Sequence, residues 1–565
     1  MRTLAVRCVR AWGQICSGAL AVIRTVGGQS AIAITISQSE GVTVHHTSAC
    51  ISRTPSRWAL GICRWPAAAI LATAFGQQAV AADFFVHDTG DPLANGVALV
   101  GAIHAAMSTP EEDDRVLLDP GAHYALANPD KADPSNGLPV ITSGITLRGG
   151  YNADNQITTI ERQHNAPQFR ILQIQPNIQW VKQDNCTGPE PHDFPPTVSL
   201  EYLQLSNGDI SDIAGAADTG GGILNLDGRL FLYRSKVTGN HANAGGGIAN
   251  EAYVLTYENH CFGTTITEAR FSQGSVSIQE SSIHGNRALM SGGGAVNGSD
   301  MRIDHSTIDA NQGDEYGGGI INGGTLEISN STISGNSTLG TRPGSDAAGI
   351  HNSSGRLAVS FSTVAFNQGA GIANQSGSVT LSDTILAGNV VGASRQAFDC
   401  SGVFTSRGHN LIGFADMSGA VDPLSACTMT AARGDQIGSD PAAPIDAKLA
   451  PLAANGGFTQ THALLAGSPA INRANSASSA CPMDDQRGII RRRFPADACD
   501  VGPFEKGESG NCGLNCSAWT IVSICARNPY ACQKLILPKI EKLPQIPNCL
   551  LDGPGCGPLP PLDFQ

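Results

Sequence analysis

The chain has 565 residues, of which 66 are glycine, 5% are aromatic and 15% are charged, a composition unlike that of a helical enzyme of this size. The net charge of −13 is unevenly spread. Residues 1–82 contain seven Arg, no Lys and one acidic residue and so carry +6, which leaves −19 on the remainder. A body this acidic argues against binding to a nucleic-acid backbone, and it disfavours anionic polysaccharides unless a cation bridges the two. We therefore expect no nucleic-acid partner.

Residues 1–82 are predicted to be a leader that includes a signal peptide at about 53–82. Three arginines precede a short apolar stretch, and the small residues Val80 and Ala82 stand at the −3 and −1 positions before Asp83. This layout is typical of a secretory signal cleaved after Ala82, and the apolar stretch is too short for a membrane span. The first 50 or so residues exceed what such a signal needs, which leaves a downstream start or an extended leader open. An organelle transit peptide is a weaker alternative.

Residues 83–130 are predicted to form an N-terminal cap. Residues 83–86 have the composition of a strand. Leu99, Ile103 and Ala106 then fall on one face of a short helix, and a further strand and turn follow. A stack of β coils needs such a cap because its bare end exposes strand edges.

Residues 131–397 are predicted to be the coils of a solenoid, because one two-part phrase repeats along them. The first part is a glycine cluster closed by an aliphatic or Ala residue. Successive clusters lie 25, 47, 25, 30 and 22 residues apart, and their closing residues are Ile223, Ile248, Ala295, Ile320, Ile350 and Ile372. The second part is an aliphatic residue three positions before an asparagine, or four positions at the last repeat; these asparagines are Asn240, Asn286, Asn311, Asn336, Asn367 and Asn389.

Within one period, segments such as residues 325–329 alternate small polar and aliphatic residues, the pattern of a half-buried strand. Each period is therefore one coil of a right-handed parallel β-helix in an all-β chain, with insertions near 176–197 and 251–273. Ile320 is expected to point into the core of this stack, with Ile248 below it and Ile350 above it. The recurrent asparagines have two interpretations. They form an internal amide ladder from coil to coil, which we favour because they keep register with the aliphatic residues, or they line a groove as ligands.

Cysteine usage supports export. Four cysteines precede residue 83, and the even number of twelve that remains indicates disulfides. Neighbouring positions suggest the pairs Cys186–Cys261, Cys400–Cys427 and Cys481–Cys499. The last six lie in the Cys/Pro-rich tail, residues 506–565, where no pairing can be deduced and where Cys512 and Cys516 could also be half of a metal site. We expect the tail to be either a disulfide-stapled mini-domain or a disordered stalk.

The chain resembles exported bacterial β-helix proteins. Residues 83–175 are similar to their N-terminal cap with a Cys-Ser-Leu-Arg-Glu-Ala signature, of which Leu99 and Ala102 remain. Residues 220–389 resemble the repeats of chlamydial polymorphic outer-membrane proteins, with Ile or Val in place of Phe. Residues 398–505 are similar to the choice-of-anchor Q domain, in the phrases at 408–413, 455–457, 461–465, 467–471, 485–488 and 499–505. The resemblance implies surface display on bacteria and a domain that forms the C-terminal part of the β-helix. It assigns no catalytic residue.

Parallel β-helices also carry polysaccharide lyases, glycoside hydrolases and uronate epimerases, so an enzyme remains the alternative. The adjacent carboxylates Asp484 and Asp485 are the best pair for glycoside cleavage, but their phrase matches a turn of the resembling domain. His192 stands in a Pro-His-Asp triplet like that of mannuronan epimerases, in a Pro-rich insertion where chance explains it better. His284 reads as a bend residue, and His462 is expected to precede and cap a core strand.

We therefore predict a secreted or bacterial cell-surface protein, associated with the outer membrane or released, that acts as a non-catalytic scaffold in adhesion or carbohydrate contact. The expected partner is a glycan or another ligand on a host or cell surface. We expect a monomer without cofactor, and no residue is assigned to a catalytic, cofactor-binding or metal site.

Overall fold

The computed structural model describes residues 81–108, 114–182, 189–211, 218–261, 264–272, 274–339, 347–392, 396–417, 426–475, 481–491 and 498–506, and the backbone of five strands between 20 and 62. The chain divides into two units, Met1–Gln78 and Ala79–Gln565. In the first unit, short strands form an antiparallel three-stranded sheet and one separate pair: β1 (Leu20–Arg24), β2 (Ala31–Ile36) and β3 (Val42–His45), then β4 (Ala49–Cys50) with β5 (Gly61–Ile62). The predicted signal peptide and tail lie almost wholly outside the described residues.

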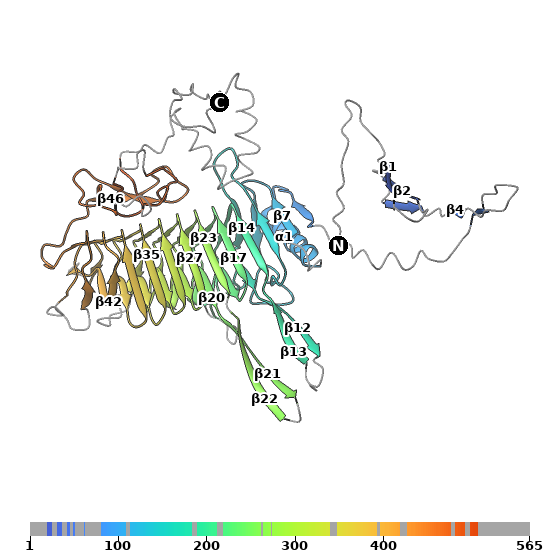
Figure 1. The fold of residues 1–565 in the computed structure, drawn as a ribbon, viewed down its shortest axis with the longest axis horizontal. Helices are drawn as coiled ribbons and strands as arrows, with labels where there is room; N and C mark the ends of the chain where they lie inside the picture. Colours follow the sequence, from blue (N-terminus) through green and yellow to red (C-terminus); the bar gives the residue numbers. More distant parts are fainter. Residues whose placement is uncertain are drawn as a thin grey trace, which may run out of the picture. The chain divides into compact units, whose positions relative to one another are not determined.

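The second unit is a stack of β coils. One coil runs through four short strands, and the next coil repeats them in parallel pairing. The strands of this representative coil are β26 (Ala295–Asn297), β27 (Asp300–Asp304), β28 (Thr307–Asp309) and β29 (Gln312–Gly313). Figure 1 shows the successive coils side by side. The predicted parallel solenoid is thus confirmed, while the right hand of the coil stays a prediction.

The strands at each of these four positions form a separate parallel ladder, and the two longest ladders are described first. The first, which we call the front ladder, contains β6 (Asp83–Val86), β7 (Asp114–Leu118), β9 (Ile145–Arg148), β14 (Thr197–Glu201), β17 (Arg229–Tyr233), β23 (Ser275–Gln279), β27, β31 (Thr325–Ser329), β35 (Arg356–Ser360), β38 (Ser378–Ser382), β42 (Cys400–Ser406) and β44 (Cys427–Thr430). The second, which we call the strap-side sheet, contains β8 (His123–Leu126), β10 (Thr158–Arg162), β15 (Leu203–Ser206), β18 (Lys236–Thr238), β24 (Ser282–His284), β28, β32 (Thr332–Ser334), β36 (Thr363–Ala365), β39 (Ile385–Ala387), β43 (Leu411–Ile412) and β45 (Gln436–Ile437).

The two remaining ladders are shorter. One follows the glycine clusters and contains β11 (Leu172–Ile174), β16 (Ile223–Leu226), β20 (Ile248–Glu251), β26, β30 (Ile320–Asn322), β34 (Ala347–Asn352) and β37 (Ala370–Asn374). The other, which we call the fourth sheet, contains β19 (His241–Ala244), β25 (Arg287–Ser291), β29 and β33 (Ser337–Thr338). The glycine clusters are needed where these two ladders meet, since a Cβ on Gly318 would clash with the backbone carbonyl of Ser337.

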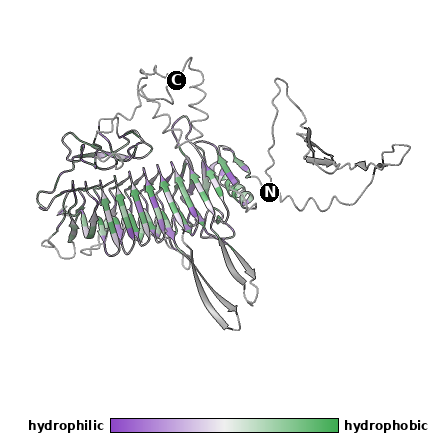
Figure 2. Cartoon of the chain, in the orientation of Figure 1, coloured by the Kyte–Doolittle hydropathy of each residue, from purple (hydrophilic) through white to green (hydrophobic). Residues whose placement is uncertain are grey.

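The core is a set of aliphatic columns inside the coils. Figure 2 shows hydrophobic residues recurring along the stacked strands. Ile320 is 0% exposed and points inward, as predicted. Its register partners are Ile350 on one side and Ala295 on the other. The expectation that Ile248 lies directly below Ile320 is wrong, because the coil that carries Ala295 intervenes.

Buried amide ladders run along the stack beside these columns. Each repeat asparagine after Asn240 receives hydrogen bonds from the backbone N–H and the side-chain amide of the preceding one, as from Asn286 to Asn311 at 2.9 and 3.0 Å. The amide-ladder interpretation is therefore confirmed, and the groove interpretation is wrong because these side chains are buried. A second ladder, which the sequence analysis missed, joins Asn225, Asn250, Asn297, Asn322, Asn352 and Asn374.

The N-terminal end of the stack is covered as predicted. Helix α1 (Pro92–Met107) buries Leu99, Ile103 and Ala106 on one face. Its start is defined by Asp91, whose side chain accepts a hydrogen bond from Leu93 N–H, and by a proline in the first turn. Strands β6 and β7 pair beside it.

Both predicted insertions are antiparallel hairpins: β12 (Asn177–Lys182) with β13 (Pro189–Phe194), and β21 (Tyr253–Cys261) with β22 (Thr264–Ser272). They project from the same side of the stack (Figure 1). The disulfides Cys400–Cys427 and Cys481–Cys499 are present as predicted. Cys186 and the tail cysteines lie outside the described residues, so the Cys186–Cys261 pair stays a prediction.

The coils end at β45, and the described residues of 440–506, which we call the strap, fold back along the outside of the strap-side sheet. The predicted C-terminal part of the β-helix, 398–505, therefore belongs only in its first third to the coils. The strap carries the antiparallel pair β46 (Leu449–Ala453) and β47 (Thr461–Leu464). It folds back because outward apolar residues of the last coils, including Ile385 and Leu411, need cover. They form a second core with strap residues Leu464, Val501 and Phe504.

Candidate functional site

The outer surface of the front ladder carries rows of polar and charged side chains with a few apolar ones among them. In register across successive strands lie Ser199, Phe231, Ser277, Arg302, Glu327, Ala358 and Thr380. All of them are exposed or half-buried, and Phe231 is 44% exposed. The acidic residues of this surface face other residue types, since Glu327 lies between Arg302 and Ala358, and Asp300 lies between Ser275 and Thr325.

Toward the N-terminal end of the stack, a cluster of aromatic and arginine side chains lies at the edge of this surface. The aromatic–arginine cluster consists of Tyr151, Tyr202, Tyr233, Arg148, Arg234 and Phe458. The ring of Tyr202 meets those of Tyr151 and Tyr233 edge-on, at centroid distances of 6.5 and 5.7 Å. The guanidinium of Arg234 lies 5.0 Å from the Tyr233 ring and 3.6 Å from the Phe458 ring.

The corner between the front ladder and the strap-side sheet is built from a column of non-glycine residues with positive φ. Their φ values lie between 44° and 55°, and the column, which we call the corner column, is Tyr202, Arg234, Glu280, His305, Asn330, Phe361 and Asp383. Left-handed backbone is uncommon outside glycine and marks a position that the surrounding structure holds in place.

The strap is attached along this corner column. The side chain of Arg491 donates to Asn330, and Asp383 accepts hydrogen bonds from the backbone N–H groups of Asn475 and Gly502. His305 Nδ1 lies 2.9 Å from a carboxylate oxygen of Asp304, and its Nε2 lies 3.4 Å from one of Asp484 in the strap. Phe458, near the tip of the strap, lies over Arg234.

A serine and a histidine meet where the strap crosses β32. Ser334 Oγ lies 2.8 Å from His462 Nε2, and His462 Nδ1 lies 2.7 Å from the carbonyl of Ala450. Because that carbonyl can only accept, Nδ1 carries the proton and Nε2 accepts from the serine. Burial lowers the pKa of His462 and so favours the neutral ring. This arrangement has the form of a nucleophile and its base, but both residues are only 3% exposed, so no substrate reaches it and its role is attachment.

The other residues singled out in the sequence are not assembled into one site. Asp485 is fully buried, accepts from the Arg487 guanidinium and holds a turn through the backbone N–H groups of Arg487 and Ile489. His284 ends β24 and pairs with Asp309 at 2.8 Å. His192 lies on β13 of the first hairpin, and His462 lies inside β47 rather than before a strand, which corrects that expectation.

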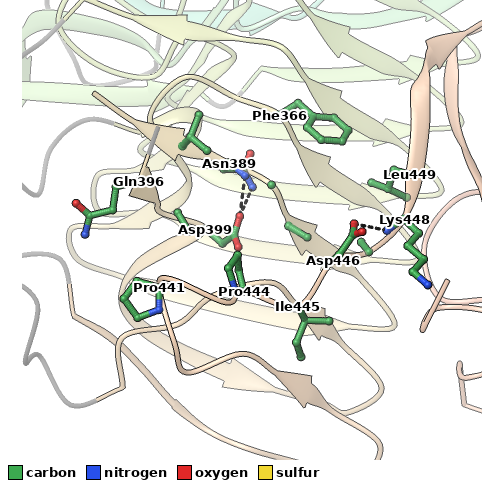
Figure 3. A pocket seen from close by; sticks show the side chains of 15 residues that line it. Phe366, Asn389, Gln396, Asp399, Pro441, Pro444, Ile445, Asp446, Lys448 and Leu449 are labelled. Atoms are coloured by element: carbon green, nitrogen blue, oxygen red, sulfur yellow. Dashed lines mark hydrogen bonds between the residues drawn. The ribbon is translucent and has the colours of Figure 1, made fainter. Parts of the chain in front are cut away.

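A cavity of about 450 Å³ lies between the last coils and the beginning of the strap (Figure 3). Phe366, Leu449, Ile445 and two prolines form most of its apolar wall, while Gln396, Asp446 and Lys448 add polar groups. Asp399 also borders it, but both of its oxygens are engaged with N–H groups of the chain.

Asp399 ends the first amide ladder in the place of an asparagine. Its Oδ1 accepts from the backbone and side-chain N–H groups of Asn389, and Oδ2 accepts from Phe414 N–H at 2.8 Å. Burial raises the pKa of Asp399 to about 7, while these three donors act in the opposite direction. Asp places an oxygen on both sides, whereas an asparagine would turn its NH₂ group toward one of these N–H donors, which explains why Asp stands here.

Within the described residues, no group of three or more His, Cys, Asp or Glu side chains is arranged to hold a metal ion. In the same part of the chain, no helix combines the length and apolar character that crossing a bilayer demands. No family model, curated protein or solved structure matches the chain.

Proposed function

We propose that the chain is an exported, right-handed β-helix scaffold that holds a glycan or another cell-surface ligand against its front ladder without converting it. The observation that carries this proposal is the outer surface of that ladder, because rows of polar and charged side chains, with a few apolar ones, run along it over successive coils. Extended, flat surfaces of this kind suit a chain-like ligand, whereas small substrates favour concave pockets.

One further feature supports the proposal. The disulfides Cys400–Cys427 and Cys481–Cys499 suit an oxidising compartment, such as the exterior or the envelope of a bacterium.

The test is binding and turnover measured on the same protein. A protein that begins at Asp83 is applied to a glycan array and to bacterial and host cells to measure binding. The release of reducing or unsaturated sugars from polysaccharides is followed with and without calcium to measure turnover. We expect binding and no product. Steady cleavage or epimerisation of any polysaccharide, lost on changing Asp484, Asp485 or His192, contradicts the proposal and favours an enzyme.

The surface responsible is located with two matched substitutions. Ser277→Trp places a bulky ring in the middle of the front row, whereas Ser337→Trp places the same ring at a half-buried position of the fourth sheet. We expect the first variant to lose binding and the second to keep it. Equal binding by both variants contradicts the assignment to the front ladder.

A further inference from the structure

The corner column extends beyond Arg234, which is the last of its residues that the strap contacts, and the residue types around it change there. Every member from Asp383 to Arg234 except Glu280 contacts a strap residue, and the contact of Arg234 is with Phe458. The next member, Tyr202, packs instead against Tyr151, Tyr233 and the two arginines of the cluster. The column thus continues past the strap as a half-buried aromatic surface.

Aromatic side chains are scarce in this protein, which makes their concentration here informative. The chain has eight tyrosines and an aromatic content of 5%, yet three of the tyrosines meet at successive corners of neighbouring coils. The surrounding rows of the front ladder mix Ser and Thr with Arg, Glu and Gln, and Phe231 is the aromatic residue among them. Tyrosine and arginine dominate the energetics of many recognition surfaces because they combine apolar area with polar groups.

Phe458 presents the most accessible ring of the cluster. One face of the ring is occupied by the Arg234 guanidinium at 3.6 Å, and the side chain is still 47% exposed. Arg234 is itself fixed by Glu280 at 2.8 Å and by the Tyr233 ring. The ring is therefore held in place before any ligand arrives, which lowers the entropic cost of binding.

The cluster carries paired charges rather than a net charge. Arg148 pairs with Glu201 at 3.2 Å, and Arg234 pairs with Glu280. An anionic partner would have to compete with these carboxylates and with the charge of −19 on the residues after 82. A neutral partner with C–H faces and many hydroxyls meets no such penalty, because aromatic faces are negative and the planar Arg and Glu groups offer donors and acceptors.

We propose that the aromatic–arginine cluster is the anchoring site for a neutral glycan, with a sugar ring lying on the free face of Phe458 and hydroxyls reaching the arginine and glutamate groups beside Tyr202 and Tyr233. The inference rests on the proposed function and names both its ligand class and its contact point. A glycan anchored here would run on from the corner along the polar and charged rows of the front ladder.

The test uses neutral hexasaccharides of glucose, xylose and N-acetylglucosamine, with hexagalacturonate as the acidic comparison, and titration calorimetry on the full chain. We expect at least one neutral sugar to bind, and Phe458→Ala and Tyr202→Ala each to weaken it about tenfold or more. Leu465→Ala is the control, because Leu465 is an exposed strap residue (48%) that lies beside Lys448 instead of the cluster. It should bind as the unmodified chain does.

Thermal unfolding checks that each variant is folded, and Phe458→Ala is the safer one because that ring is exposed. Unchanged neutral-sugar binding in folded Phe458→Ala and Tyr202→Ala overturns the inference and leaves the proposed function standing. Preference for hexagalacturonate overturns it too. Self-association that Phe458→Ala abolishes, without an effect on sugars, makes a second copy the occupant. Failure of the unmodified chain to bind any glycan contradicts the glycan ligand of both proposals.

Discussion

Single side chains decide how the coils close, and Asp399 is the clearest case. The amide ladder needs an acceptor at its end, and Asp399 supplies acceptors to Asn389 on one side and to Phe414 on the other. An asparagine would continue the ladder toward Asn389 but would turn its NH₂ group toward the Phe414 N–H, leaving two donors face to face. The ladder therefore ends because of a change of one functional group.

Asp399→Asn is predicted to remove a pH dependence of stability. The folded-state pKa of about 7 lies above the ordinary value of 3.8, so the folded protein holds this proton more tightly. The stabilisation is complete below pH ~3.8 and is lost as the pH rises through about 7, at up to about 1.4 kcal/mol per pH unit. Chemical unfolding between pH 4 and 8 should show this slope in the unmodified chain relative to the variant. Parallel curves would contradict the prediction.

Ile320→Asp is predicted to destabilise the coil stack by several kcal/mol. The side chain is 0% exposed between Ala295 and Ile350, so a carboxylate there loses its water without gaining a partner. The matched control is Ser277→Asp, which adds the same charge to the outer surface beside Arg302 and should change the free energy of unfolding by less than about 0.5 kcal/mol. Denaturant titration of both variants measures the difference. Similar midpoints would show that Ile320 is not in the core.

At the scale of elements, the coils could be predicted and the strap could not. In a sequence repeat, residues at equal positions of successive periods stack on one another. The repeat therefore predicted the aliphatic columns of the core and the first amide ladder. The second ladder was also readable, since Asn225, Asn250 and Asn322 each stand two residues after the aliphatic residue that closes a glycine cluster. The sequence prediction covered only the first asparagine series.

The strap has no period, and its partners are far away along the sequence. Ser334 and His462 are separated by 128 residues, and Gln486 donates to the carbonyl of Ser306 across 180 residues. Nothing local to either segment signals such contacts. The aromatic–arginine cluster could not be predicted from the sequence for the same reason, because Phe458 contacts Arg234 only in the folded strap.

The attachment of the strap is predicted to weaken in mild acid. Burial lowers the pKa of His462, so the folded state resists the proton that the unfolded histidine takes up. Its contribution to stability is present above the ordinary pKa of about 6.5 and is lost as the pH falls below that value. Hydrogen exchange of the β46 and β47 amides, corrected for intrinsic rates, should therefore accelerate from pH 7.5 to 5.5.

The matched variant is His462→Gln, whose amide can still donate to Ala450 and accept from Ser334 but does not titrate. We expect its strap amides to lose most of this acceleration, and amides of β28 in the coil to change little in either protein. Equal acceleration in the variant would show that another group controls the strap.

For the molecule as a whole, export is the expectation with the most direct test. Val80 and Ala82 precede Asp83, the first residue of β6. The exported protein is therefore predicted to begin at or near Asp83, because cleavage there removes the leader and leaves β6 intact. N-terminal sequencing of protein from the culture medium or the cell envelope decides the matter. A start within residues 1–50 would contradict it.

The strap along the corner column has a consequence for how the molecule unfolds. In a plain solenoid each coil contacts only its neighbours, so the stack loses coils from its ends and the loss spreads step by step. Here Thr307 and Ser334 bond to strap residues Gln460 and His462, while Asp383 binds Asn475. A single polypeptide thus ties several coils to one another over a distance that no neighbour contact covers. For one of these coils to unfold, the strap must also detach from the others. We therefore expect these coils to unfold together in one cooperative transition.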